Sequence, residues 1–101
     1  MQALSGKILI VDDDPIQRRL LQEAVHKFGY RSKTAENGAE AVRIMTGPEA
    51  SEIDLIILDM VMPELDGLGV LERLRSDKIS TPVIVQTAHG GIDTVVSVMN
   101  A

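Results

Sequence analysis

The chain has 101 residues and a formal net charge of −5 at pH 7, so we expect one domain over residues 1–101 with a single modest core. An acidic domain lacks the concentrated basic surface that binds nucleic-acid phosphates, and direct nucleic-acid contact is not expected of it. The sequence has no cysteine, which excludes disulfides and thiolate metal sites and suits the cytoplasm. Its first apolar run, Ile8–Val11, is too short for a signal-peptide core or a membrane span.

Three apolar runs predict strands that are buried on both faces of a sheet, because few polar residues interrupt them. These runs are Lys7–Val11, Leu55–Leu58 and Pro82–Gln86, and the mixed stretch Tyr30–Ala35 predicts an outer strand. Hydrophobic residues form 45% of the chain and aromatic residues only 2%, so aliphatic side chains must fill the core. This composition suits a sheet that is covered by helices.

Capping residues and apolar spacing predict four helices that follow the four strands. The first helix has Asp14 as its N-cap and Pro15 at its first position, and Gly29 ends it. The second and third helices follow the caps Asn37 and Asp66. The fourth is predicted from the helical spacing of its apolar residues Ile92, Val95, Val96 and Met99. Strands and helices therefore alternate along the whole chain.

This alternation implies parallel strands joined by right-handed crossovers, so the carboxyl ends of all strands lie at one edge of the sheet. In such sheets ligands bind beyond this edge, where the strand order reverses. Asp12 and Asp13 follow the first strand, Asp59 follows the third and Thr87 follows the fourth. We therefore expect the first and third strands to be neighbours and their carboxylates to meet.

Carboxylates in close contact repel one another unless a cation lies among them. Oxygen ligands without a local Cys or His favour magnesium (Mg2+) or a similar ion, which typically keeps several waters that a phosphate group can replace. An aspartate beside such an ion can act as a nucleophile and form an acyl phosphate, and Thr87 is placed to donate a hydrogen bond to it. The sequence thus predicts magnesium as the cofactor and phosphoryl chemistry at the strand ends.

Three segments resemble the CheY-like receiver domains of response regulators in two-component signalling: ILIVDD (8–13), LDMVMPELDG (58–67) and PVIVQTA (82–88). The resemblance runs from about Lys7 to the chain end and implies a flavodoxin-like, doubly wound parallel sheet in three α/β/α layers. It implies a sensor histidine kinase or phosphotransfer protein as phosphoryl donor, and an output domain beyond residue 101, for example a transcriptional one. It also implies a phosphoacceptor that assists its own phosphorylation and dephosphorylation, and not an enzyme.

The resemblance assigns a role to each site residue. Asp59 is the expected phosphoacceptor, and Thr87 is the hydroxyl that moves towards the phosphoryl group. The expected metal ligands are Asp13 directly, Asp12 mainly through water, Asp59, and the backbone carbonyl of Val61. Val61 and His89 match two variable positions that tune the lifetime of the phosphoryl group.

The family continues with a fifth strand, a lysine that contacts the phosphoryl group and a fifth helix, whereas this chain stops at Ala101. Without these elements the strand Val83–Gln86 would be an open edge, and part of the first-helix stripe Ile16, Leu20 and Ala24 would stay uncovered. We therefore expect self-association of this truncated receiver, as a homodimer or by domain swapping.

Two other functions remain open. Asp12 and Asp14 have the spacing of magnesium-dependent phosphatases with an Asp-x-Asp nucleophile, although Asp14 before Pro15 also fits a helix cap. The second alternative is an interaction module that is never phosphorylated. Turnover of phosphate esters would favour the phosphatase, and failure to form an acyl phosphate would favour the interaction module.

Overall fold

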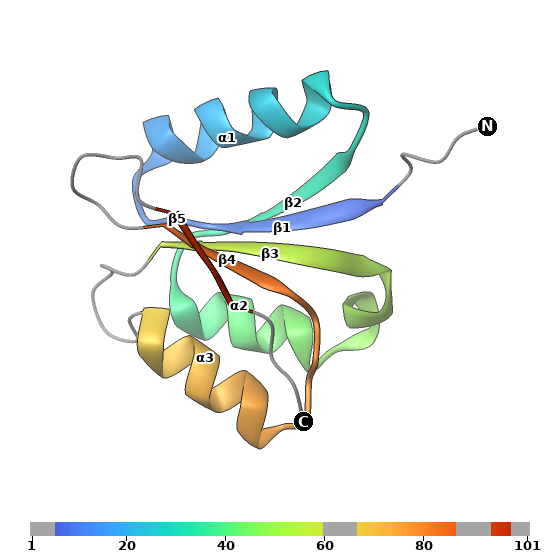
Figure 1. The fold of residues 1–101 in the computed structure, drawn as a ribbon, viewed down its shortest axis with the longest axis vertical. Coiled ribbons are helices and arrows are strands. Elements are labelled where there is room, and N and C mark those ends of the chain that lie inside the picture. Colours follow the sequence, from blue (N-terminus) through green and yellow to red (C-terminus); the bar gives the residue numbers. More distant parts are fainter. Residues whose placement is uncertain (1–5, 60–66, 87–93, 98–101) are drawn as a thin grey trace.

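The computed structural model describes residues 6–59, 67–86 and 94–97. These residues form strands and helices that alternate over most of the chain (Figure 1). In chain order the elements are β1 (Lys7–Val11), α1 (Pro15–Lys27), β2 (Arg31–Ala35), α2 (Gly38–Met45), the 3-10 helix η1 (Pro48–Glu52), β3 (Ile53–Asp59), α3 (Gly67–Ser76), β4 (Val83–Gln86) and β5 (Thr94–Ser97).

The strands form one sheet in the order β2-β1-β3-β4-β5. The first four strands are parallel, which confirms the predicted parallel sheet and the pairing of β1 with β3. Helix α1 covers one face of the sheet, whereas α2 and α3 cover the other (Figure 1). The fold therefore has the three layers of a doubly wound α/β domain, and its strand order reverses between β1 and β3.

Aliphatic side chains form a core on each face of the sheet. Leu9 on β1 and Leu58 on β3 are fully buried in the cluster that includes residues of α2 and α3. Ile10, the next residue of β1, faces the other way and packs with Val25 of α1, since successive residues of a strand point to opposite faces. Burial on both faces explains why the central strands are continuous apolar runs.

The outer side of α1 carries apolar residues that the described part of the chain does not cover. Ile16 is 72% exposed and Leu20 is 56% exposed, and Ala24 is exposed as well. Leu55 and Ile57, on the same side of the sheet, are only partly buried. The expected exposure of the first-helix stripe is therefore observed.

The segment that follows β4 corrects two predictions. Residues Thr94–Ser97 form β5, antiparallel to β4, where the spacing of Ile92, Val95, Val96 and Met99 predicted a helix. Five of the eight residues 92–99 are apolar, a pattern that distinguishes the helical period from the strand period poorly. β-Branched residues favour a strand where β4 offers unpaired backbone groups. The edge of β4 is consequently not open, because the chain itself supplies the neighbouring strand. The 3-10 helix η1 is a further element that the apolar spacing does not predict.

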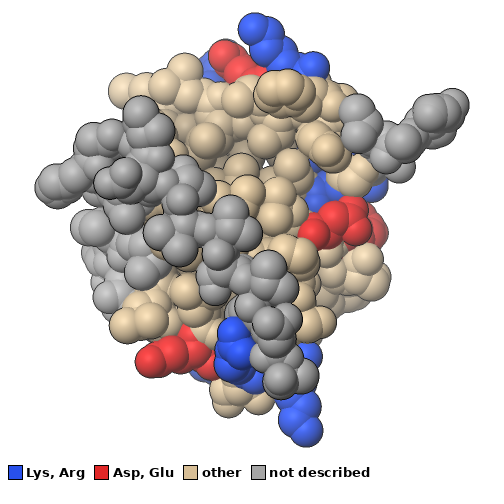
Figure 2. Space-filling view, in the orientation of Figure 1, with Lys and Arg blue, Asp and Glu red and all other residues tan. Residues whose placement is uncertain are grey.

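Charged side chains lie in separate groups on the face shown in Figure 2, with basic residues beside acidic ones. One network joins Lys7, at the start of β1, to Glu49 and Glu52 of η1, with N–O distances of 3.5 and 3.2 Å. Lys33 of β2 adds a 3.3 Å contact to Glu49. These pairs tie η1 to the edge of the sheet where β1 begins.

None of the helices among the described residues is long and apolar enough to cross a membrane.

Helices α1 and α3 end in the same hydrogen-bonded turn, in which one residue adopts a left-handed conformation. That residue is Gly29 after α1, with φ 91°, but Lys78 after α3, with φ 62°. The bonds run from Gly29 N to His26 O (3.0 Å), from Tyr30 N to Val25 O (3.1 Å), from Lys78 N to Arg75 O (3.0 Å) and from Ile79 N to Leu74 O (2.9 Å). Only the second turn places a Cβ atom in a strained backbone region.

Replacing Lys78 by glycine is expected to raise the free energy of unfolding by about 0.5–1 kcal/mol, because it removes this strain. Urea unfolding monitored by circular dichroism measures the change. Lys78→Ala is the matched control, since it shortens the side chain but keeps the Cβ atom. A Lys78→Gly midpoint no higher than that of Lys78→Ala would contradict the explanation.

Candidate functional site

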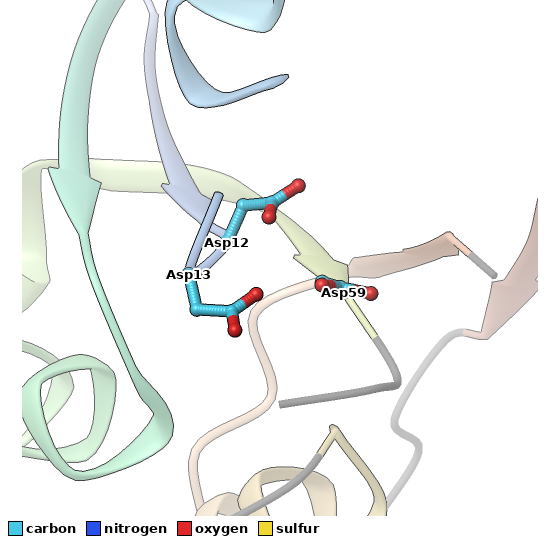
Figure 3. Close-up of side chains that lie close together, drawn as sticks. All are labelled: Asp12, Asp13 and Asp59. Atoms are coloured by element: carbon cyan, nitrogen blue, oxygen red, sulfur yellow. The ribbon is translucent and has the colours of Figure 1, made fainter. Parts of the chain in front are cut away.

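Three aspartates converge at the edge of the sheet where β1 and β3 end. Asp12 and Asp13 directly follow β1, and Asp59 is the last residue of β3. Their ligand oxygens all lie within 4.8 Å of one another. Figure 3 shows the three side chains projecting from the ends of these two strands. The predicted meeting of the carboxylates is therefore confirmed.

Hydrogen bonds fix the loop between β1 and α1. The backbone N–H of Asp14 donates to Asp12 Oδ1 (2.9 Å), and Arg18 Nη1 donates to the backbone carbonyl of Asp12 (2.9 Å). Asp14 Oδ1 accepts the N–H of Ile16 (3.0 Å) as the N-cap of α1. Asp14 is therefore a helix cap, as one interpretation of the sequence held. One oxygen of Asp12 is occupied by the loop, and the other can serve a ligand.

The three carboxylates differ in their access to solvent. Asp12 is 4% exposed and Asp59 is 8% exposed, whereas Asp13 is exposed. Burial raises the pKa of Asp12 from 3.8 to about 6. The hydrogen bond from Asp14 N–H opposes this rise, and the charges of Asp59, Asp13 and Asp14 add to it. The ionised cluster is thus poorly solvated and self-repelling, a combination that favours binding of a cation.

The donor set of the cluster is suited to a hard divalent cation. Asp12, Asp13 and Asp59 offer carboxylate oxygens only, which is the ligand type that magnesium and calcium prefer. The same geometry places one carboxylate, that of Asp59, at the end of a central strand next to two others that can hold an ion. An aspartate in this position can attack an electrophilic phosphorus atom.

Three residues expected at the site lie outside the described residues. They are Val61, Thr87 and His89. Their assigned roles, the backbone ligand, the switch hydroxyl and the modulator, stay predictions. The aspartates alone carry the site as the structure describes it.

Gln86 is a residue near the site that sequence reasoning missed. It is the last residue of β4 and the register partner of Asp59. Its side-chain Oε1 is buried and has no hydrogen-bond partner among the described residues. A polar residue that ends a buried apolar run, directly before Thr87, is the signal in the sequence that points to it.

Comparison with known proteins places these features in a family. Residues 8–101 match the family model described as the response regulator receiver domain. The chain is 43% identical over 81 residues to the two-component response regulator ARR22 of Arabidopsis thaliana, covering 80% of this chain and 56% of that protein. It is 39% identical over 92 residues to sporulation initiation phosphotransferase F of Bacillus subtilis, covering 91% of this chain and 72% of that protein.

Larger proteins and solved structures also match. The chain is 39% identical over 82 residues to the sensor histidine kinase RcsC of Escherichia coli, but it spans only 8% of that protein's length. It resembles the solved structure of the response regulator protein TrrA of Thermotoga maritima in complex with Mg(2+)-BeF, with a TM-score of 0.74 and 41% sequence identity. That match covers 84% of this chain and 71% of the other.

The raised pKa of Asp12 predicts how the stability of the metal-free protein depends on pH. A folded-state pKa of about 6, above the ordinary aspartate value of 3.8, means that the folded state holds a proton that the unfolded state releases between these values. The free energy of unfolding should therefore fall as pH rises from about 4 to 6, by on the order of 1–2 kcal/mol after solvent screening. Urea unfolding in chelator across this range measures the fall.

Asp12→Asn is expected to flatten this pH dependence, because asparagine keeps an oxygen for the Asp14 N–H and carries no charge. Glu36→Gln, the same change of charge at an exposed position, is the matched control and should keep the wild-type slope. Equal slopes in the wild type and Asp12→Asn would refute the role assigned to Asp12.

Proposed function

Because this chain belongs to the response regulator receiver domain family, we propose that it accepts a phosphoryl group on the carboxylate of Asp59 and thereby switches a partner or an output domain. The single observation that carries the proposal is the position of Asp59 at the end of β3, with Asp12 and Asp13 within 4.8 Å. The family gives the general role, and this geometry supports the choice of Asp59.

The three aspartates fit a magnesium ion through their oxygen donors. Asp13 would bind it directly, Asp12 mainly through water, and Asp59 and the carbonyl of Val61 would complete the site. When bound, the ion neutralises charge on the group in transfer. Similarity to TrrA, whose structure contains Mg(2+)-BeF, supports this choice of ion.

The chain's own residues would perform the transfer. An oxygen of Asp59 forms the new bond to phosphorus while the bond from phosphorus to the donor atom of the partner breaks, which leaves an acyl phosphate. Thr87 would then donate a hydrogen bond to a phosphoryl oxygen, and Val61 and His89 would tune the lifetime of the group. The domain is a phosphoacceptor that takes part in its own phosphorylation and dephosphorylation, and we do not propose an enzyme with turnover.

The phosphatase alternative is weakened by the position of Asp14. Its carboxylate accepts the N–H of Ile16 as a helix cap and is not part of the acidic cluster. An Asp-x-Asp mechanism would need Asp14 as its acid–base partner. The interaction-module alternative differs from our proposal in one measurable step, which is formation of the acyl phosphate.

The proposed partners are a sensor histidine kinase or a phosphotransfer protein as donor, and an output domain, of which transcription regulators are one kind. Similarity to the sensor histidine kinase RcsC and to sporulation initiation phosphotransferase F supports the two classes of donor. We propose that the phosphoryl transfer takes place in the cytoplasm, a compartment that suits a chain without cysteine. The net charge of −5 supports the absence of nucleic-acid contact by this domain.

The phosphoacceptor assignment predicts that Asp59→Asn abolishes labelling. The protein is incubated with a small-molecule phosphodonor and magnesium, and the acid-labile adduct is located by mass spectrometry. Asp77→Asn, a change at an exposed aspartate that pairs with Arg73, is the matched control and should be labelled as the wild type. An adduct mapped to a residue other than Asp59 would overturn the assignment, and no adduct at all would favour the interaction module.

We also propose that two copies associate through the exposed stripe of α1, since Ile16 and Leu20 present apolar surface. Leu20→Gln is expected to lower the apparent mass measured by light scattering over a concentration series. Leu68→Gln is the matched control, because Leu68 on α3 is 55% exposed and Leu20 is 56% exposed. A wild-type protein that stays monomeric across the series would disprove the association.

A further inference from the structure

Gln86 lies at the end of β4, the strand next to Asp59 of the acidic cluster. Ile10 on β1 and Ile57 on β3 are register partners that both pack toward α1. Asp59 lies two residues further along β3, and Asp12 lies two residues after Ile10, directly beyond the end of β1. The backbone N–H of Asp12 still donates to the carbonyl of Ala35 at the end of β2 (3.1 Å), so the strand pattern continues to Asp12 and both side chains belong to this side of the sheet. Parallel pairing places Gln86 of β4 opposite Asp59. Oxygen-bearing side chains thus form a row across three adjacent strands at the carboxyl edge.

Gln86, the third member of this row, has a side-chain oxygen without a hydrogen-bond donor among the described residues. This oxygen, Oε1, is buried. A buried carbonyl oxygen without a donor destabilises a protein, since it has lost its water. The neighbouring carboxylates of Asp12 and Asp59 only accept hydrogen bonds when ionised. A donor that arrives with a ligand would satisfy the oxygen.

We infer that Gln86 is a further residue of the magnesium site, in which its Oε1 accepts a hydrogen bond from a water molecule of the hydrated ion. The inference rests on the proposed function, which brings the ion to the aspartates. Magnesium keeps several of its waters when it binds through carboxylates, and each such water is a strong donor. Adjacent strands are about 4.8 Å apart, a distance that a glutamine side chain spans.

Gln86→Met tests the inference by removing the acceptor oxygen while keeping the length of the side chain. Calorimetric titration with magnesium is expected to show a Kd about tenfold higher than that of the wild type, the scale on which outer ligands act. The metal-free urea midpoint should stay equal or rise, because the variant lacks the unsatisfied oxygen. Loss of affinity without loss of stability is a result that a purely structural role for Gln86 would not give.

Two further variants sharpen the comparison. Gln86→Glu keeps an acceptor oxygen and should hold the Kd within about twofold of the wild-type value or lower it. Ile84→Met is the matched control and should leave the Kd unchanged. Ile84 lies on the same side of β4 as Gln86 but two residues earlier in the strand, away from the row. If Gln86→Met does not fold, Gln86→Glu decides, and a Kd raised about tenfold in that variant would refute the inference.

Asp13→Ala separates failure of this inference from failure of the proposed function. Its expected result is loss of the magnesium response. A wild-type protein that does not respond to magnesium would overturn both the proposed metal site and the role of Gln86. If the wild type binds magnesium and Asp13→Ala does not, while Gln86→Met keeps the wild-type Kd, the role of Gln86 alone is overturned.

Discussion

Asp12, Asp13 and Asp59 hold their oxygens within 4.8 Å of one another at the carboxyl edge of the sheet. Like charges at this separation repel, and for Asp12 burial adds a second cost that raises its pKa to about 6. The rest of the domain has to supply enough packing to keep these groups together. The unfavourable contact favours binding of a cation, because an ion would relieve repulsion and poor solvation at once.

The sheet resists this repulsion because β1 and β3 are packed on both faces. Leu9 and Leu58 lie in the core under α2 and α3, and Ile10 lies in the core under α1. The aspartates follow directly on these strands, so moving them apart would disturb close-packed side chains. The hydrogen bonds of the loop to the carboxylate and the backbone carbonyl of Asp12 also hold the Asp12 side chain in one orientation.

The three aspartates of the cluster lie in different environments. Asp13 is exposed and accessible to a hydrated ion, Asp12 has one oxygen held by the loop, and Asp59 is nearly buried at the end of a central strand. These differences support the proposal that Asp13 is a direct metal ligand, that Asp12 is a ligand acting mainly through water and that Asp59 is the nucleophile. Asp14, one residue further, is committed to capping α1 and takes no part. Position relative to the sheet, more than residue type, is the basis of the roles that we propose.

The sequence by itself determined the strands β1 to β4, the helices α1 to α3 and the convergence of Asp12, Asp13 and Asp59, but not the 3-10 helix η1. Long apolar runs, caps and strand–helix alternation are local signals, and parallel topology then leaves one edge for the strand ends. The segment Thr94–Ser97 could not be predicted, because its short apolar pattern fits a helix or a strand and the free edge of β4 decides between them. Only the tertiary structure placed Gln86 beside Asp59 and raised the pKa of Asp12, because register and burial depend on segments distant in the sequence.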